Sequence, residues 1–383
     1  MNHSHVRLAL AASLITFGLV DAPRAHAFTV QSGFTNGCHE RISVASFLIG
    51  GAGLELTDRD GVELLTDDQI PDGEWEEILE HLYPNTSEFP RGQRFFIFSI
   101  ITGTRAPDSE GFSLTNLAVL RSVQSDPHGQ YIHCLRAAED DYEAGNDTAL
   151  AGCRDVIREE IGNAFDAFVD VGVPLIEVQM TLENYGTIEV EVSPIGYHFG
   201  RALHTLQDSF THAIRSPDLR SVVHTMNYEA AIADTLDEER DGMPHSAAAD
   251  SCVTVGGVTG ELVNRERVFA AIEAGADLVR AFGRVSQRRL AEDRESLALE
   301  VDGVLLKWFR RANPETLGYE VCDITNDYCS SPWLETARLS PAGPVLSCTT
   351  TPNRSRMPLS LSLLAGVLLL RLAPRTLRLR GAR

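Results

Sequence analysis

The sequence predicts a mainly α-helical protein that carries one small β-hairpin. Apolar residues recur at helical spacing through most of the chain. One segment, residues 176–192, instead alternates apolar and polar side chains around a Gly-containing turn, which is typical of a hairpin. The chain shows no internal repeat. The predicted helices span residues 38–49, 74–83, 90–103, 128–144, 147–171, 195–215, 261–283 and 288–311.

The N-terminus has the regions of a secretory signal peptide. A basic start precedes an apolar run from Leu8 to Val20, and small residues at 25–27 supply a cleavage site. The alternative is a buried N-terminal helix, but Pro23 ends the apolar run before Ala25, which argues against that helix. We therefore expect residues 1–27 to be removed on export, and a helical domain to span residues 28–312.

The C-terminal segment has the pattern of a second sorting signal. Cys348 is followed by a polar spacer, an apolar run from Met357 to Leu370 and a cluster of arginines. The run is shorter than the roughly 20 apolar residues that span a membrane. The pattern resembles C-terminal sorting tails of the myxobacterial type, which implies processing or lipid attachment near the cysteine, and a simple membrane anchor is the alternative. We expect a Pro/Ser/Thr-rich stalk at 313–348, a sorting tail at 349–383, and a location in the cell envelope or outside the cell.

The charge of the chain argues against some partners. Of 33 Lys and Arg and 54 Asp and Glu, the two ends hold nine arginines and one aspartate, so the remaining body carries a net charge of about −29. Such a body repels the phosphates of nucleic acids and anionic lipids. We therefore do not expect nucleic acid as a partner, and we expect contact with the envelope through the tail.

Seven cysteines are typical of an oxidising compartment, and the odd number leaves one without an intramolecular partner. Cys348 in the tail is the natural odd residue. The sequence does not determine how the other six pair, although Cys322 with Cys329 and Cys134 with Cys153 are the shortest closures. No C-x-x-C spacing occurs, so we do not expect a zinc-thiolate site.

The strongest chemical signal is the segment at 200–212, GRALHTLQDSFTH. On a helix, His204, Asp208 and His212 lie four residues apart and form one stripe. Two imidazoles and a carboxylate along one edge suit zinc, which binds nitrogen and oxygen ligands. A solvated His/Asp face is the alternative interpretation.

The string LHTLQDSFTH at 203–212 resembles the LHTLQDFYxHS helix of Het-C-type proteins, which are similar to zinc-dependent phospholipases C and to fungal single-strand nucleases. The resemblance covers residues 28–285, but its specific motif is confined to this helix. It implies a helical bundle of the zinc-dependent phospholipase C type, up to three zinc ions, and hydrolysis of a phosphodiester.

The same resemblance implies further ligands. His39 lies in a passage similar to the early HExIT motif of the family, Asp108 follows Pro107 as in its PD loop, and His133 resembles the histidine after that loop. His128 competes with His133 and fits a surface position better.

The sequence does not determine the last ligands of the predicted metal site. His224 and His245 are both placed to complete the site, with Glu229 and Asp250 as possible carboxylate partners. In the family the late histidine and glutamate are four residues apart, whereas both of these pairs are five apart.

Glu40 follows His39, but the second histidine of an H-E-x-x-H metalloprotease motif is absent. Glu40 is then either a hydrogen-bond acceptor next to the metal ligands or an exposed residue. The chain also has no Walker loop, no G-x-S-x-G elbow and no dinucleotide-binding fingerprint.

These patterns predict an exported zinc metallohydrolase that acts on a phospholipid or another phosphodiester, as a phospholipase C does. Paired zinc ions would lower the pKa of a bridging water and hold the phosphoryl oxygens. In this hypothesis Asp208 bridges two metals, and Asp108 binds one and accepts the proton of the water. The alternatives are a Het-C-like surface module with structural zinc and a secreted nuclease, which the charge disfavours.

Overall fold

The structure of the chain is a computed structural model, and every residue that it describes lies within Met1–Val345. The segments predicted as signal peptide, stalk and sorting tail lie outside the described residues, and so do His245, Glu229, Asp250 and Cys348. The described residues are 37–51, 67, 69–83, 86–112, 126–169, 174–182, 185–216, 218–227, 240, 258–287 and 294–312.

Helices dominate the described part of the chain, with 66% of its residues, so the predicted mainly α class is confirmed. The other elements are short strands and one 3-10 helix. The α-helices among these residues are α2 (Cys38–Gly50), α3 (Trp75–Leu82), α4 (Arg91–Ser109), α6 (Tyr142–Val169), α7 (Pro194–Thr211), α9 (Val258–Gln287) and α10 (Arg294–Trp308).

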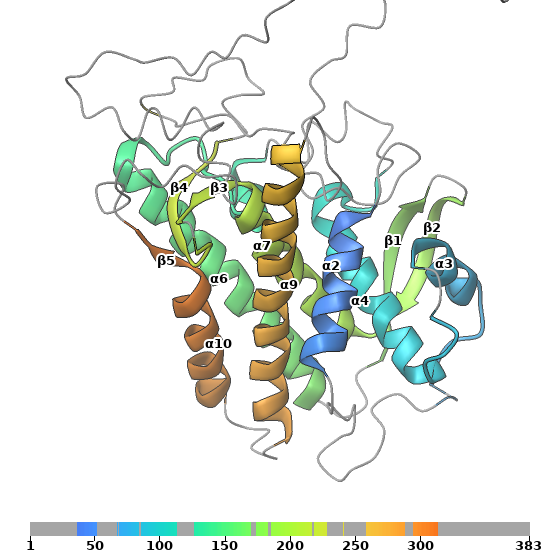
Figure 1. Ribbon diagram of the computed structural model, residues 1–383. Helices are drawn as coiled ribbons and strands as arrows, with labels where there is room; N and C mark the ends of the chain where they lie inside the picture. The colour runs from blue at the N-terminus through green and yellow to red at the C-terminus, as the bar shows by residue number, and fades with distance from the viewer. Residues whose placement is uncertain are drawn as a thin grey trace, which may run out of the picture. The chain divides into compact units, whose positions relative to one another are not determined.

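Helix α7 lies at the centre of the fold. It packs against α2, α4, α6 and α9, and α2 runs beside α9 (Figure 1). Leu203, Leu206 and Phe210 are fully buried, so α7 presents apolar side chains to its neighbours. The polar stripe of the same helix is buried with them, which makes it a site inside the core.

Two glycines allow α4 and α7 to touch through their backbones. A Cβ atom on Gly103 would lie 1.9 Å from the carbonyl oxygen of Tyr197, and a Cβ on Gly200 would lie 2.2 Å from that of Ile100. Both distances are far below van der Waals contact, so only glycine fits at either position. The close approach brings the backbone at Thr104 beside His204.

The predicted hairpin at 176–192 is confirmed. Strand β1 (Ile176–Leu182) pairs antiparallel with β2 (Gly186–Val192). Met180, Leu182, Val190 and Val192 are buried, whereas alternate residues on the other face are more exposed, which is the pattern expected of a ribbon packed on one side. The ribbon contacts α4.

The predicted helix at 128–144 is wrong. A 3-10 helix η1 (Pro127–His133) is followed by irregular backbone, and α6 begins only at Tyr142. The helix stops because Cys134 has a positive φ of 53° and forms a disulfide with Cys153 of α6. This disulfide is one of the two short closures expected from the sequence.

A second, unpredicted sheet lies beyond the C-terminal ends of α7 and α10. Strand β3 (Ala213–Arg215) pairs antiparallel with β4 (Ser221–Thr225), which pairs in parallel with β5 (Arg310–Arg311). The predicted helices 195–215 and 288–311 therefore end early, at Thr211 and Trp308. All residues of β3 and β4 are buried, so these strands lack the alternation by which a strand is recognised.

Among the described residues, no helix combines the length and apolar character needed to cross a membrane.

Candidate metal centre

Four separate elements bring the central cluster together. Helix α7 supplies His204 and Asp208, α2 supplies His39, the last turn of α4 supplies Asp108, and η1 supplies His133. The side chains of His39, His204 and Asp208 are fully buried, and those of His133 and Asp108 are 7% and 9% exposed. Five of the predicted ligands thus lie together inside the core.

Three of these side chains form a compact group. His133 Nδ1 lies 3.0 Å from Asp208 Oδ2, His204 Nε2 lies 2.9 Å from the same oxygen, and the two nitrogens are 3.2 Å apart. Tetrahedral zinc with bonds of roughly 2.0 Å places neighbouring ligand atoms about 3.3 Å apart. The group could therefore hold a metal ion with little movement of its side chains.

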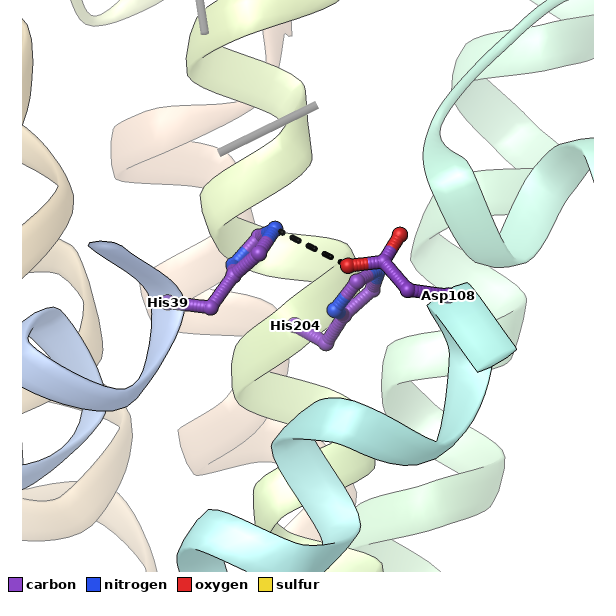
Figure 2. Close-up of side chains that lie close together, drawn as sticks. All are labelled: His39, Asp108 and His204. Atoms are coloured by element: carbon purple, nitrogen blue, oxygen red, sulfur yellow. Dashed lines mark ion pairs between the residues drawn. The ribbon is translucent and has the colours of Figure 1, made fainter. Parts of the chain in front are cut away.

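A second, wider group consists of His39, Asp108 and His204 (Figure 2). His39 Nε2 lies 4.0 Å from Asp108 Oδ2, and His204 Nε2 lies 3.9 Å from Asp108 Oδ1. The rings of His39 and His204 are stacked with their centroids 4.2 Å apart. Asp108 would have to approach the two nitrogens to bind the same ion tightly.

The two groups share His204, and its Nε2 has a single lone pair, so His204 can bind only one ion at a time. Asp208 can serve two, because its oxygens face different histidines. Oδ1 lies 3.1 Å from His39 Nε2, whereas Oδ2 faces His133 and His204. This geometry is compatible with the predicted bridging role of Asp208.

The buried carboxylates of the cluster favour positive charge beside them. Burial lowers the pKa of His39, but the carboxylates of Asp208 and Asp108 outweigh burial and raise it to about 9. The pKa of His133 is raised for the same reason. Burial raises the pKa of Asp208, but the surrounding histidines hold it well below its usual range. Two carboxylates in a dry site thus require positive charge, which protons or a metal ion can provide.

Backbone carbonyls orient two of the histidines. His204 Nδ1 donates to the carbonyl oxygen of Thr104 at 2.8 Å, and His212 Nδ1 donates to that of His133. A carbonyl can only accept, so the proton of each neutral ring lies on Nδ1 and the lone pair lies on Nε2. This is the arrangement that metal-binding histidines commonly adopt.

His212 follows the last residue of α7 and keeps its place in the predicted stripe. Its Nδ1 lies 3.8 Å from Asp208 Oδ2. It belongs to neither metal-binding group found among the described residues.

His224 lies on β4, where it contacts Asn146. Burial, Arg311 and Arg136 lower its pKa to about 3. Within the described part of the chain it belongs to neither metal-binding group, and the neighbouring guanidinium groups would disfavour a cation.

The expected PD loop is helical. Asp108 lies in the last turn of α4, which continues through Pro107 to Ser109 instead of ending at the predicted residue 103. Pro107 removes one backbone donor from the helix but does not end it here. The proline therefore marks the last turn of the helix, and the aspartate that follows it is held on a regular element.

Glu40 is fully buried and forms an ion pair with Arg105, so the alternative of an exposed residue is wrong. The pair joins α2 to α4 beside the predicted ligands His39 and Asp108. Two further residues outside the sequence-based prediction contact the ligands: Gln207, whose Oε1 lies 2.7 Å from His39 Nδ1, and Thr104. Gln207 stands next to Asp208 in the motif, whereas a backbone carbonyl has no sequence signal.

No family model, curated protein or solved structure matches this chain.

Proposed function

We propose that this protein is a zinc metallohydrolase that cleaves phosphodiesters, with a phospholipase C-like substrate. The observation that carries the proposal is the buried group of His133, His204 and Asp208. Its ligand atoms are 2.9–3.2 Å apart, close to the edge of a zinc tetrahedron. Nitrogen and oxygen donors without thiolate also suit a hydrolytic zinc site.

Bound zinc would supply a water of lowered pKa and a Lewis acid for the phosphoryl oxygens. Asp208 holds the site together through both carboxylate oxygens. Asp108 is placed to act as the base, because it is the most exposed of the five side chains and lies 3.9–4.0 Å from His204, His133 and His39. At that distance Asp108 makes no direct hydrogen bond to these histidines, so its carboxylate can accept a proton from a water bound beside it.

In the proposed reaction, the oxygen of the water forms a bond to phosphorus and one of its protons passes to a carboxylate oxygen of Asp108. The bond between phosphorus and the leaving alkoxide breaks, and the alkoxide takes the proton from Asp108. The side of the cluster formed by Asp108 and His133 is the least buried, so we place the substrate there.

A surface module with structural zinc is the second candidate. The complete burial of His39, His204 and Asp208 favours it, because structural zinc sites are closed whereas catalytic ones keep an open position. Export and envelope attachment are part of both proposals, and they rest on the two ends of the chain.

Zinc content by mass spectrometry, measured beside hydrolysis of bis-nitrophenyl phosphate, phosphatidylcholine and single-stranded DNA, tests the proposal. We expect His204→Ala to lose bound zinc and hydrolysis together, because His204 belongs to both groups. His81→Ala is the matched control, since His81 is exposed on α3. Zinc without hydrolysis would support the structural module, and absence of zinc would overturn both candidates. Cleavage of DNA alone would replace the phospholipase with a nuclease.

A further inference from the structure

A chain of buried hydrogen bonds connects His39 to the backbone of α7. His39 Nδ1 lies 2.7 Å from Gln207 Oε1, and Gln207 Nε2 lies 2.7 Å from Ser43 Oγ. Ser43 Oγ lies 3.0 Å from Thr104 Oγ1, which lies 3.2 Å from the carbonyl oxygen of Gly200. All four side chains are fully buried, so this relay lies in the core formed by α2, α4 and α7.

The donor and acceptor of every hydrogen bond in this relay follow from its last member, the carbonyl of Gly200. The carbonyl of Gly200 can only accept, so the hydroxyl of Thr104 donates to it. Thr104 has one hydroxyl proton and therefore accepts from Ser43. Ser43 has then used its own proton and must accept from the amide nitrogen of Gln207.

The amide orientation of Gln207 is thereby fixed, with its nitrogen toward Ser43 and its oxygen toward His39. Because that oxygen can only accept, the Nδ1 of His39 donates to it. In the neutral ring the lone pair then lies on Nε2, which is the atom that faces Asp208 Oδ1 at 3.1 Å.

We infer that Gln207 is a positioning residue that fixes His39 in its metal-binding tautomer, and that Ser43 and Thr104 hold Gln207 in the required orientation. This inference rests on the proposed metal centre. The opposite amide orientation would present an NH2 group to His39 Nδ1, move the ring proton to Nε2 and remove the lone pair from the site. Thr104 also contributes its backbone carbonyl to His204, so one residue orients two histidines.

Zinc affinity, measured by competition with a chelator on the purified full chain, separates the alternatives. Loss of a group that orients a ligand typically costs 10–100-fold in metal affinity, so we expect about that loss in Gln207→Met. Gln207→Glu keeps an acceptor for His39 and should bind zinc within a few-fold of the wild type. Thr104→Val removes the hydroxyl that sets the direction and should weaken zinc binding, whereas Thr104→Ser retains it.

A second readout is independent of activity and of the variants. In the zinc-loaded wild type, the 15N chemical shifts of the histidine side chains should show His39 protonated at Nδ1 and bound through Nε2. His39 bound through Nδ1, or Gln207→Met with wild-type zinc affinity, would overturn the inference and leave the metal centre intact. If the wild type binds no zinc, the result contradicts the proposed function, on which the role of Gln207 rests. If Gln207→Met does not fold, the two Thr104 variants and the 15N shifts decide.

Discussion

Gly200→Ala should destabilise the protein and disturb the metal centre, although glycine to alanine usually stabilises a helix. The added Cβ would lie 2.2 Å from the carbonyl oxygen of Ile100 and 2.7 Å from the amide nitrogen of Thr104. Ordinary contact needs more than 3 Å, so α4 and α7 must separate locally by about 1 Å. Overpacking of this kind costs about 1–3 kcal/mol, and here the obstruction is backbone that cannot change rotamer.

Gly303→Ala on α10 is the matched control. Among the described residues, no atom outside the neighbouring backbone of α10 lies within 4 Å of its added Cβ, so the gain in helix propensity should stabilise the protein by about 0.5–1 kcal/mol. The free energy of unfolding, from urea denaturation, should therefore change in opposite directions in the two variants. The separation also moves the carbonyl of Thr104 away from His204, so Gly200→Ala should bind zinc more weakly. A Gly200→Ala protein as stable as Gly303→Ala would refute the close backbone contact.

Two further predictions concern charged side chains that form ion pairs. Arg105→Met should cost about 3–5 kcal/mol, because it breaks an ion pair in which Glu40 is fully buried. The double variant Glu40→Leu/Arg105→Met should recover part of this loss in urea denaturation, and no recovery would contradict the pairing. Burial raises the pKa of Asp277, but hydrogen bonds from Lys307 and Trp308 lower it overall. The pKa of Asp277 is lower in the folded protein than in the unfolded chain. Ionised Asp277 therefore adds to the free energy of unfolding at pH values above its ordinary pKa of 3.8, and this contribution is lost as the pH falls through the folded pKa. The stability difference between wild type and Asp277→Asn should shrink over that range, and a constant difference would exclude the linkage.

The sequence predicts the long helices well and the elements between them poorly. Helices α4, α6 and α7 have apolar residues at helical spacing; the predicted starts of α4 and α7 are one residue from the observed ones, and that of α6 is five residues late. The errors lie where a tertiary constraint acts. Cys134 is held with a positive φ beside its disulfide, and β4 is buried on both faces, so neither shows a pattern along the sequence.

The candidate site could be predicted in part because α7 carries two of its ligands at helical spacing. His39, Asp108 and His133 have no such spacing to α7, and they were expected only from the resemblance of short segments. The contacts that orient the ligands are harder still. Thr104 acts through a backbone carbonyl, which has no sequence signal. Gln207 lies in the motif, but its relay joins residues of three helices, so no local pattern contains the whole relay.

The burial of the cluster also bears on which function it serves. A closed zinc site stabilises a fold without needing a base, whereas hydrolysis is accelerated by a base that a water can reach. Asp208 is fully buried and already faces three histidines, which suits a ligand. Asp108 faces the same histidines from 3.9–4.0 Å and retains some exposure. The position of Asp108, close to the histidines but beyond hydrogen-bond distance, suits a base better than a ligand, and this difference between the two aspartates is our reason for proposing the hydrolase over the structural module.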